Sequence, residues 1–205
     1  MNRIVLIIMS ALVLMFFTPV RAWAENPSLP EFGPTLPPIG FVWHCREEPA
    51  ECRSRAQKKD DAHWYEVQMS DKIWKAYNEV NTQVNHDILP ASDQELYGKP
   101  EHWAYPTTAG DCEDYLLLKK RKLQARGFEP QKMRIAVVLQ EKGEGHAVLV
   151  VRTNVGAFVL DNRRDEILLW HETGYHFVKW QSAEDPKIWL SLVDKPSSLY
   201  DLVSN

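Results

Sequence analysis

Three residue types that together support nucleophilic catalysis follow one another in the second half of the chain. They are Cys112, His146 and Asp161, separated by 34 and 15 residues. A cysteine attacks as its thiolate, a histidine can take the thiol proton, and a carboxylate can orient that histidine. The sequence therefore predicts a thiol hydrolase. Each residue also has a plainer interpretation: a buried thiol, a structural histidine after a glycine turn, and a turn at Asp161-Asn162.

One helix is predicted over residues 111–126, with Cys112 in its first turn. Acidic residues cluster at its start, basic residues occupy its later turns, and a glycine follows its end, as the helix dipole favours. The unpaired N–H groups of a first turn stabilise a thiolate, and the Cys112 N–H is a candidate oxyanion donor. The neighbouring Asp111, Glu113 and Asp114 oppose this effect, because their charges raise a thiol pKa. A nearby imidazolium or another cation must then neutralise them.

The elements that would position these residues change from helical to extended along the chain. An amphipathic helical pattern covers residues 60–88, where Ser70 or Asp71 could cap a second helix. After the helix at 111–126, the pattern predicts strands over 134–139, 146–153, 157–160, 175–181 and 188–193. Short glycine-bearing links between them are typical of antiparallel hairpins. The predicted fold class is α+β, with helices packed on an antiparallel sheet.

The hairpin over residues 146–161 is the most informative local prediction. Turning the chain at 154–156 places His146 and Asp161 on neighbouring strands, about 5 Å apart at the backbone. The two side chains could therefore form a hydrogen bond without any long-range contact. The helix carrying Cys112 would then only need to pack its first turn against this hairpin.

The start of the chain has the layout of a secretory signal peptide, predicted over residues 1–24. A basic start precedes the apolar run 4–17, and Ala22-Trp23-Ala24 offers small residues at the positions that signal peptidase requires. The alternative is a retained membrane anchor, for which the apolar run is short. We therefore expect a periplasmic or secreted protein of a Gram-negative bacterium, with no stable membrane insertion after cleavage. An extended proline-rich arm is predicted over 25–39 and a single domain over 40–205.

Charge and composition exclude several classes of function. The chain carries 24 basic and 28 acidic residues, for a formal net charge of −4, and no lysine or arginine run suggests a basic patch. These features give no support for nucleic-acid binding. No glycine-rich phosphate loop is present, so nothing indicates a nucleotide, flavin or nicotinamide cofactor.

The odd number of cysteines singles out one thiol. Cys45 and Cys52 lie seven residues apart with Pro49 between them, and an oxidising compartment favours their pairing. The alternative is a metal site that uses His44, although no second CxxC accompanies these cysteines. Pairing the two leaves Cys112 free, either as a buried side chain or as a reactive group.

Three segments together resemble a known family. GDCEDY at 110–115, GEGHAVLVV at 143–151 and FVLDN at 158–162 are similar to the bacterial transglutaminase-like cysteine proteinases. The similarity extends over roughly 40–175 and includes the upstream VNHDILPASDQELYG, HWAYP and FVWHC segments. The resemblance implies a papain-like or transglutaminase-like fold in which Cys112 attacks a peptide carbonyl. His146 would move the proton and Asp161 would hold the imidazole.

The resemblance also implies a metal ion. Adhesin-cleaving members of the family bind calcium through carboxylates beside the nucleophile, and Asp111, Glu113 and Asp114 match those positions. Calcium takes six to eight oxygen ligands and would cancel the local negative charge. The alternative is that these are ordinary acids at a helix start, with Asp111 as N-cap. Trp103, shortly before the nucleophile, is a candidate wall of the cleft, with core packing as its alternative.

For some members of the family the resemblance implies particular partners. These are a large surface adhesin, cut near a dialanine, and an inner-membrane cyclic-di-GMP receptor that holds the enzyme inactive. The same three residues would also serve a transglutaminase, an amidase or a cell-wall peptidase. A further alternative is a non-enzymatic module that binds calcium through its acids while the thiol stays inert.

Overall fold

The structure, a computed structural model, describes residues 28–54 and 65–194. The predicted signal peptide over 1–24 and the first residues of the predicted helix at 60–64 lie outside these ranges. Within them, no helix is both long enough and apolar enough to cross a bilayer.

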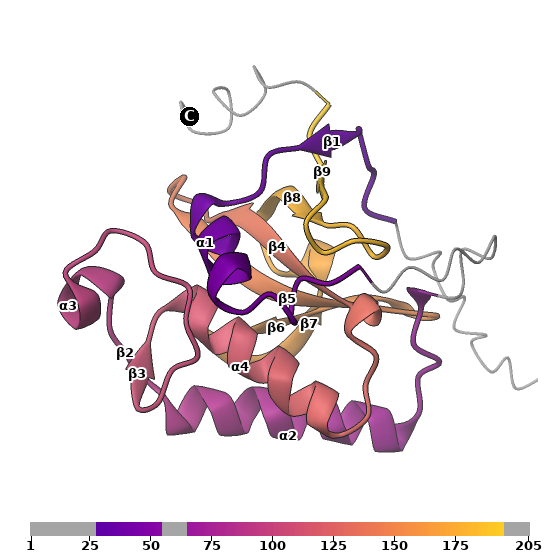
Figure 1. The fold of residues 1–205 in the computed structure, drawn as a ribbon. Helices are drawn as coiled ribbons and strands as arrows, with labels where there is room; N and C mark the ends of the chain where they lie inside the picture. The colour runs from indigo at the N-terminus through magenta and orange to yellow at the C-terminus, as the bar shows by residue number, and fades with distance from the viewer. Residues whose placement is uncertain (1–27, 55–64, 195–205) are drawn as a thin grey trace, which may run out of the picture.

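A seven-stranded antiparallel sheet forms the centre of the molecule (Figure 1). Its strand order is β1-β9-β8-β4-β5-β6-β7. Consecutive strands from β4 to β7 are neighbours, as short glycine-bearing turns favour. The strands are β1 (Pro34–Thr35), β4 (Met133–Leu139), β5 (Gly145–Thr153), β6 (Gly156–Asp161), β7 (Arg164–Leu169), β8 (His176–Gln181) and β9 (Trp189–Ser191).

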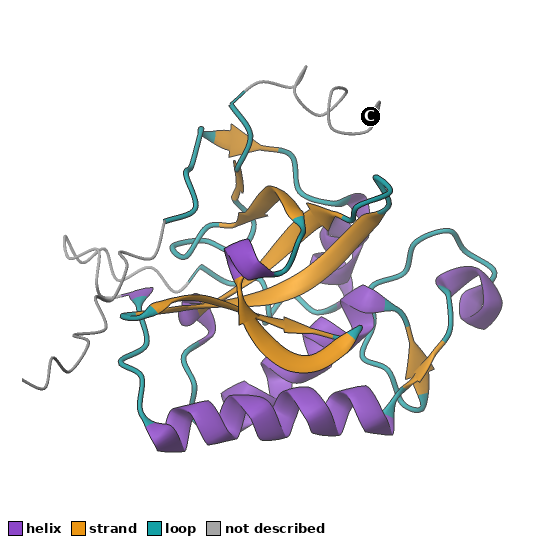
Figure 2. Cartoon of the chain, turned by 180° about the vertical axis from the view of Figure 1, so that it is seen from behind, coloured by secondary structure: helices purple, strands orange, loops and turns teal. Residues whose placement is uncertain are grey.

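Two helices, α2 (Asp71–Asp87) and α4 (Cys112–Ala125), cover one face of this sheet (Figure 2). The Ser70 hydroxyl caps α2 by accepting a hydrogen bond from the Ile73 N–H. Beyond the end of α4, Gly127 adopts φ +90°, a conformation that glycine tolerates and that ends a helix. The larger hydrophobic core lies between these helices and the sheet. The helix predicted at 111–126 is present, and of the helical pattern predicted over 60–88 the structure shows a helix at 71–87, while residues 65–70 are not α-helical.

Smaller elements surround this layer. They are α1 (Ile39–Glu47), β2 (Leu89–Pro90), α3 (Asp93–Tyr97), β3 (Ala109–Gly110) and two short 3-10 turns at Pro130–Lys132 and Trp170–Glu172. The helix α3 lies between β2 and β3 in sequence, and the parallel pairing of these strands places it beyond the end of α2 and beside the start of α4 (Figure 1). The position of α3 therefore depends on a contact between residues about twenty apart in sequence.

The proline-rich segment before α1 lies against the opposite face of the sheet. Leu29 joins a second hydrophobic cluster on that face. Glu31 accepts hydrogen bonds from Arg134 at 2.9 Å and from the Trp180 indole N–H at 3.0 Å. The guanidinium of Arg134 also lies over the Trp180 ring at 4.3 Å. The described part of this segment also contributes strand β1 to the sheet, and α1 begins at Ile39, the last residue of the predicted arm.

The α+β class predicted from sequence is confirmed. The five predicted strands correspond to β4, β5, β6, β8 and β9 within one or two residues. The sequence did not predict α1 or β7. The strand β7 begins with Arg164, Asp165 and Glu166, and these charged residues conceal the alternation expected of a strand.

Candidate active site

Cys112 is the first residue of α4 and is half-buried. The preceding Gly110 allows a close approach: a Cβ atom there would lie 2.5 Å from Oδ2 of Asp114. Asp111 occupies the N-cap position but makes no capping hydrogen bond with its side chain. The GDC segment thus lets the backbone turn tightly into the helix, with the thiol presented at the positive end of the helix dipole.

The thiol of Cys112 lies in an environment that favours its protonated form. Burial raises its pKa well above the ordinary value, and the charge and hydrogen bond of Glu113 raise it further. The Sγ–H group donates to Glu113 Oε2 at 3.0 Å. The backbone N–H of Ala147 opposes this shift by hydrogen bonding to the sulfur. The carboxylate of Glu113 therefore favours the neutral thiol, whereas the amide of Ala147 favours the thiolate.

His146 and Asp161 form a buried hydrogen-bonded pair. His146 Nε2 and Asp161 Oδ1 are 2.9 Å apart, and both residues are almost wholly buried. The ladder pairs Leu149 with Leu160, so Asp161 lies one residue beyond this pair and diagonal to His146. The two residues lie on neighbouring strands as predicted, but they are diagonal and not opposite each other, and their side chains still meet. Because Nε2 is held by the carboxylate, Nδ1 is the nitrogen left to face another group.

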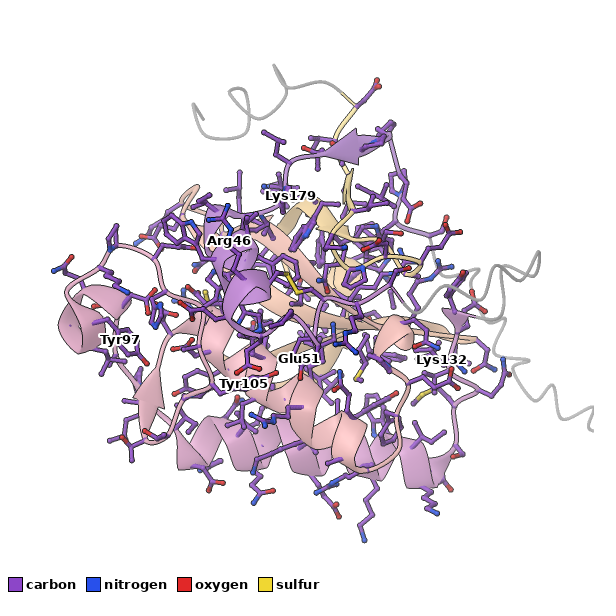
Figure 3. All side chains as sticks on the ribbon, viewed as in Figure 1. Arg46, Glu51, Tyr97, Tyr105, Lys132 and Lys179 are labelled. Atoms are coloured by element: carbon purple, nitrogen blue, oxygen red, sulfur yellow. A yellow bond between two sulfur atoms is a disulfide. The ribbon has the colours of Figure 1, made fainter. Side chains whose placement is uncertain are left out.

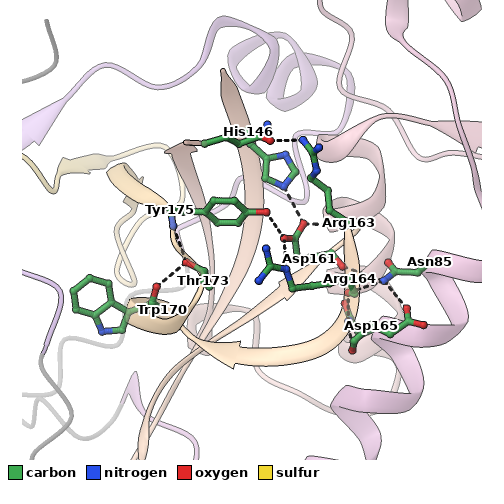
Figure 4. A network of polar contacts seen from close by, with 11 residues as sticks. Asn85, His146, Asp161, Arg163, Arg164, Asp165, Trp170, Thr173 and Tyr175 are labelled. Atoms are coloured by element: carbon green, nitrogen blue, oxygen red, sulfur yellow. Dashed lines mark hydrogen bonds and ion pairs between the residues drawn. The ribbon is translucent and has the colours of Figure 1, made fainter. Parts of the chain in front are cut away.

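Further donors surround the Asp161 carboxylate (Figure 4). The Tyr175 hydroxyl donates to Oδ2 at 2.7 Å, and the Arg163 backbone N–H donates to Oδ1 at 3.1 Å. Arg164 Nε lies 3.7 Å from Oδ2. Burial alone would raise the pKa of Asp161, but the hydrogen bonds from His146, Tyr175 and Arg163 lower it to about 2. This carboxylate is therefore ionised at any pH near neutrality.

The two halves of the site meet at the start of β5. The amide of Ala147 that hydrogen bonds to Cys112 follows directly after His146. The structure thus places the thiol beside the strand that carries His146, and His146 is bound to Asp161.

A group of three carboxylates lies beside the thiol. Asp93, Asp111 and Glu113 each offer one oxygen, and these oxygens all lie within 4.8 Å of one another. Burial and the charge of Asp111 raise the pKa of Asp93, and the same two causes raise the pKa of Glu113 to about 9. Among the described residues, Asp93 Oδ1 and Asp111 Oδ1 are buried without a hydrogen-bond partner. Such a set of close, unsatisfied oxygens is suited to a hard cation.

Asp114, which the sequence placed among the expected metal ligands, is not part of this group. It is fully buried, and its Oδ1 accepts a hydrogen bond from the Ala104 N–H at 2.9 Å. Burial raises its pKa to about 7. Its place in the group is taken by Asp93, which the sequence analysis did not identify. Asp93 follows a capping serine at the start of α3, where an acid is common for ordinary helical reasons.

The other residues considered in the sequence analysis, Trp103, Cys45, Cys52 and His44, contribute to packing, to a disulfide or to a backbone hydrogen bond. Trp103 is only 3% exposed and packs edge-on against Phe41 in the larger core, as its core-packing alternative expects. Cys45 and Cys52 form the expected disulfide. Their sulfurs are therefore not free to bind a metal, and the buried His44 instead uses Nδ1 to contact the Trp103 carbonyl at 3.1 Å.

Comparisons with known proteins agree with this geometry. The family described as "Bacterial transglutaminase-like cysteine proteinase BTLCP" matches residues 31–197. The structure is similar to calcium-bound Legionella pneumophila LapG, with 21% identity, a TM-score of 0.51, and coverage of 69% of this chain and 82% of that chain. A second structure of Legionella pneumophila LapG gives 21% identity, a TM-score of 0.50, and coverage of 68% and 80%.

A search of curated proteins gives no match for this chain. At 21% identity the structural likeness concerns the fold, which is the LapG-like, transglutaminase-like arrangement of helices on an antiparallel sheet. The family match covers most of the chain and includes Cys112, His146 and Asp161. This chain therefore belongs to the bacterial transglutaminase-like cysteine proteinase family.

Proposed function

We propose that the protein is an exported endopeptidase in which Cys112 is the nucleophile, His146 the general base and Asp161 the group that orients the base. One observation carries this proposal. His146 Nε2 is bound to the buried Asp161 carboxylate at 2.9 Å on β5 and β6, and Cys112 begins α4, the helix that packs on β5. A thiol, an imidazole with a free Nδ1 and a buried carboxylate are the parts that acyl transfer needs.

The chemistry follows from these positions. His146 Nδ1 takes the proton from the Cys112 thiol, and the sulfur forms a bond with the carbonyl carbon of the peptide. The Cys112 backbone N–H, at the start of α4, stabilises the resulting oxyanion. The C–N bond then breaks as the imidazolium returns the proton to the leaving amine. Water, activated by the same imidazole, hydrolyses the thioester and releases the thiol.

We propose that calcium binds at Asp93, Asp111 and Glu113. The close spacing of their oxygens and the two buried oxygens without partners support this assignment, as does the calcium in one LapG structure. Three carboxylates with carbonyl and water oxygens suit the coordination of calcium. A bound divalent cation would supply positive charge where Glu113 and Asp111 now raise the pKa of Cys112.

The proposed location is the periplasm or the exterior of a Gram-negative cell. The leader-like pattern over 1–24 supports export, and the Cys45–Cys52 disulfide suits an oxidising compartment. The proposed substrate is a protein, and by family resemblance it is a large surface adhesin cut near a dialanine. An inner-membrane cyclic-di-GMP receptor is the proposed regulator on the same basis.

The decisive test is cleavage of a dialanine-containing adhesin fragment, followed by gel electrophoresis and mass spectrometry. The wild-type protein in calcium should release defined fragments, and EGTA should slow their release. The variant Cys112→Ala should release none above background. Equal cleavage by Cys112→Ala would end the proposal. Transfer of a labelled amine to protein glutamine without peptide-bond cleavage would replace it with a transglutaminase.

A further inference from the structure

Tyr175 contacts both members of the His146–Asp161 pair (Figure 4). Its hydroxyl donates to Asp161 Oδ2 at 2.7 Å, while the imidazole occupies the other carboxylate oxygen. Its ring meets the imidazole edge-on, with centroids 5.5 Å apart and planes at 69°. Because each oxygen of Asp161 has its own side-chain donor, the carboxylate cannot rotate without losing one of them.

The loop before Tyr175 holds it in place. The Thr173 hydroxyl donates to the Trp170 carbonyl at 2.7 Å and accepts the Tyr175 N–H at 3.2 Å. Between them, Gly174 turns the chain with φ +75°, which L side chains rarely adopt. Tyr175 therefore has a fixed backbone position just before β8.

Arg164 approaches the same tyrosine and the same carboxylate. Its guanidinium lies 5.4 Å from the centre of the Tyr175 ring, and its Nε lies 3.7 Å from Asp161 Oδ2. The hydroxyl is thus the short contact on this oxygen, and the arginine is the longer one. Burial and the nearby Asp161 carboxylate raise the pKa of Tyr175 to about 12, so its hydroxyl remains a donor near neutral pH.

We propose that Tyr175 is a positioning residue, whose hydroxyl holds Asp161 so that His146 keeps its proton on Nε2 and turns Nδ1 toward Cys112. This inference rests on the proposed function. A neutral donor suits the task, because it orders the carboxylate without adding a second full charge beside the imidazole. The fixed tautomer is the condition for Nδ1 to act as a base toward the thiol.

The test compares Tyr175→Phe with the wild-type full chain in calcium, using two readouts. One is the rate of alkylation of Cys112 by iodoacetamide at pH 7. The other is the solvent exchange of the His146 Nε2–H proton, followed by NMR. Loss of the hydroxyl should slow alkylation about tenfold, the scale of one hydrogen bond to a charged group. Exchange of the imidazole proton should become faster by a similar factor, although thermal unfolding shows an intact fold.

Tyr105→Phe is a matched control. Tyr105 is another half-buried tyrosine whose hydroxyl interacts with a carboxylate, that of Glu51, beside α1 and α4 (Figure 3). This variant should leave both readouts unchanged. If Tyr175→Phe also leaves both unchanged, or if the two variants change them equally, the inference is wrong. A merely structural role would lower the melting temperature without changing exchange of the His146 proton.

Two further comparisons keep the inference separate from other failures. If wild-type Cys112 reacts no faster than a free thiol, the proposed function fails. If it reacts fast but Tyr175→Phe matches it, only this inference fails. Should Tyr175→Phe not fold, 3-fluorotyrosine at position 175 keeps the ring and hydroxyl and makes the hydroxyl more acidic. The His146 Nε2–H resonance should then shift, and an unmoved resonance would overturn the inference.

Discussion

The two halves of the candidate active site differ in how many of their buried polar groups have hydrogen-bond partners. On the base side, both oxygens of the Asp161 carboxylate have hydrogen-bond donors, and its pKa is lowered to about 2. On the nucleophile side, buried carboxylates face one another, and the pKa of Glu113 is raised to about 9. The protein alone therefore orders the base, whereas the thiol lies beside carboxylates that either bound protons or an added cation would neutralise.

This difference shows which half depends on its surroundings. A histidine bound to a carboxylate that already has its hydrogen-bond donors is oriented for catalysis before any ligand binds. A thiol that donates to a neighbouring carboxylate must first lose that contact. We therefore expect changes on the base side to act on catalysis directly, and changes on the nucleophile side to act through cation binding and through pH.

The largest effect is expected from Asp161→Asn, which keeps the size of the side chain but removes the acceptor that holds Nε2–H. The imidazole should then favour the wrong tautomer, and the cleavage rate should fall by about 10³- to 10⁴-fold. Steady-state cleavage of the adhesin fragment measures this. Calcium affinity, measured by calorimetry on the same variant, should be unchanged. A loss of calcium binding would show that the two halves are not separate.

The next effect concerns the cation. Asp93→Asn and Glu113→Gln should each weaken calcium binding by about 10- to 100-fold, because each removes one of three carboxylates. Isothermal titration calorimetry measures this. Asp114→Asn is the control: Asp114 is buried and acidic but lies outside the three-acid group, so its replacement should leave the affinity within about threefold. Equal losses in all three variants would support the set expected from the sequence.

The pH dependence of stability should have opposite signs in the two halves. The pKa of Glu113 is raised from 4.5 to about 9 and that of Asp114 from 3.8 to about 7, so the folded state binds more protons than the unfolded state between these values. In EGTA the melting temperature should therefore fall as the pH rises from about 5 to 8. Calcium should flatten this slope. A slope that is identical with and without calcium would contradict the proposed cation site.

On the base side the sign reverses. The pKa of Asp161 is lowered from 3.8 to about 2, so its contribution to stability is present above pH 4 and is lost as the pH falls toward 2. Asp161→Asn should therefore reduce the fall in melting temperature between pH 4 and pH 2. Calcium should not change it.

The smallest effect is expected from Lys119→Met. Lys119 is fully buried on α4, its Nζ has no hydrogen-bond partner among the described residues, and burial lowers its pKa to about 7, with Asp161 and Asp165 opposing this shift. A methionine should raise the free energy of unfolding by up to about 1 kcal/mol below pH 7, where the buried ammonium is charged. Chemical denaturation measures this. A clear loss of stability would instead show that the ammonium supports Asp161.

The sequence predicted the base side better than the nucleophile side. His146 and Asp161 lie on consecutive strands joined by a short turn, so strand periodicity alone brings them together. Cys112 was placed in the first turn of its helix by the local pattern of acids and bases. Its approach to the hairpin required the packing of α4 on β5, for which the order of the three residues and the family resemblance were the only signals.

The local sequence pattern could not predict Asp93 as the third member of the three-acid group. Asp93 follows Ser92, and Ser92 with Glu95 forms a capping box, which explains an acid at that position without any ligand. Its approach to Asp111 depends on the short parallel pair of Leu89–Pro90 with Ala109–Gly110. Two-residue strands have no periodicity to detect. The same limit applies to Trp103, whose burial depends on tertiary contacts with α1.

The short parallel pair β2–β3 has a consequence for how this protein could diversify. It positions the carboxylate of Asp93, which lies on the peripheral segment 89–110. The thiol, the imidazole and the Asp161 carboxylate instead belong to the central helix α4 and the sheet. If the proposed site binds a divalent ion, substitutions within this segment would strengthen or weaken its binding while the proposed catalytic groups keep their places. Part of the ion dependence would then be an adjustable trait, inherited on a different stretch of chain from the chemistry it governs, although Asp111 and Glu113 remain beside the thiol.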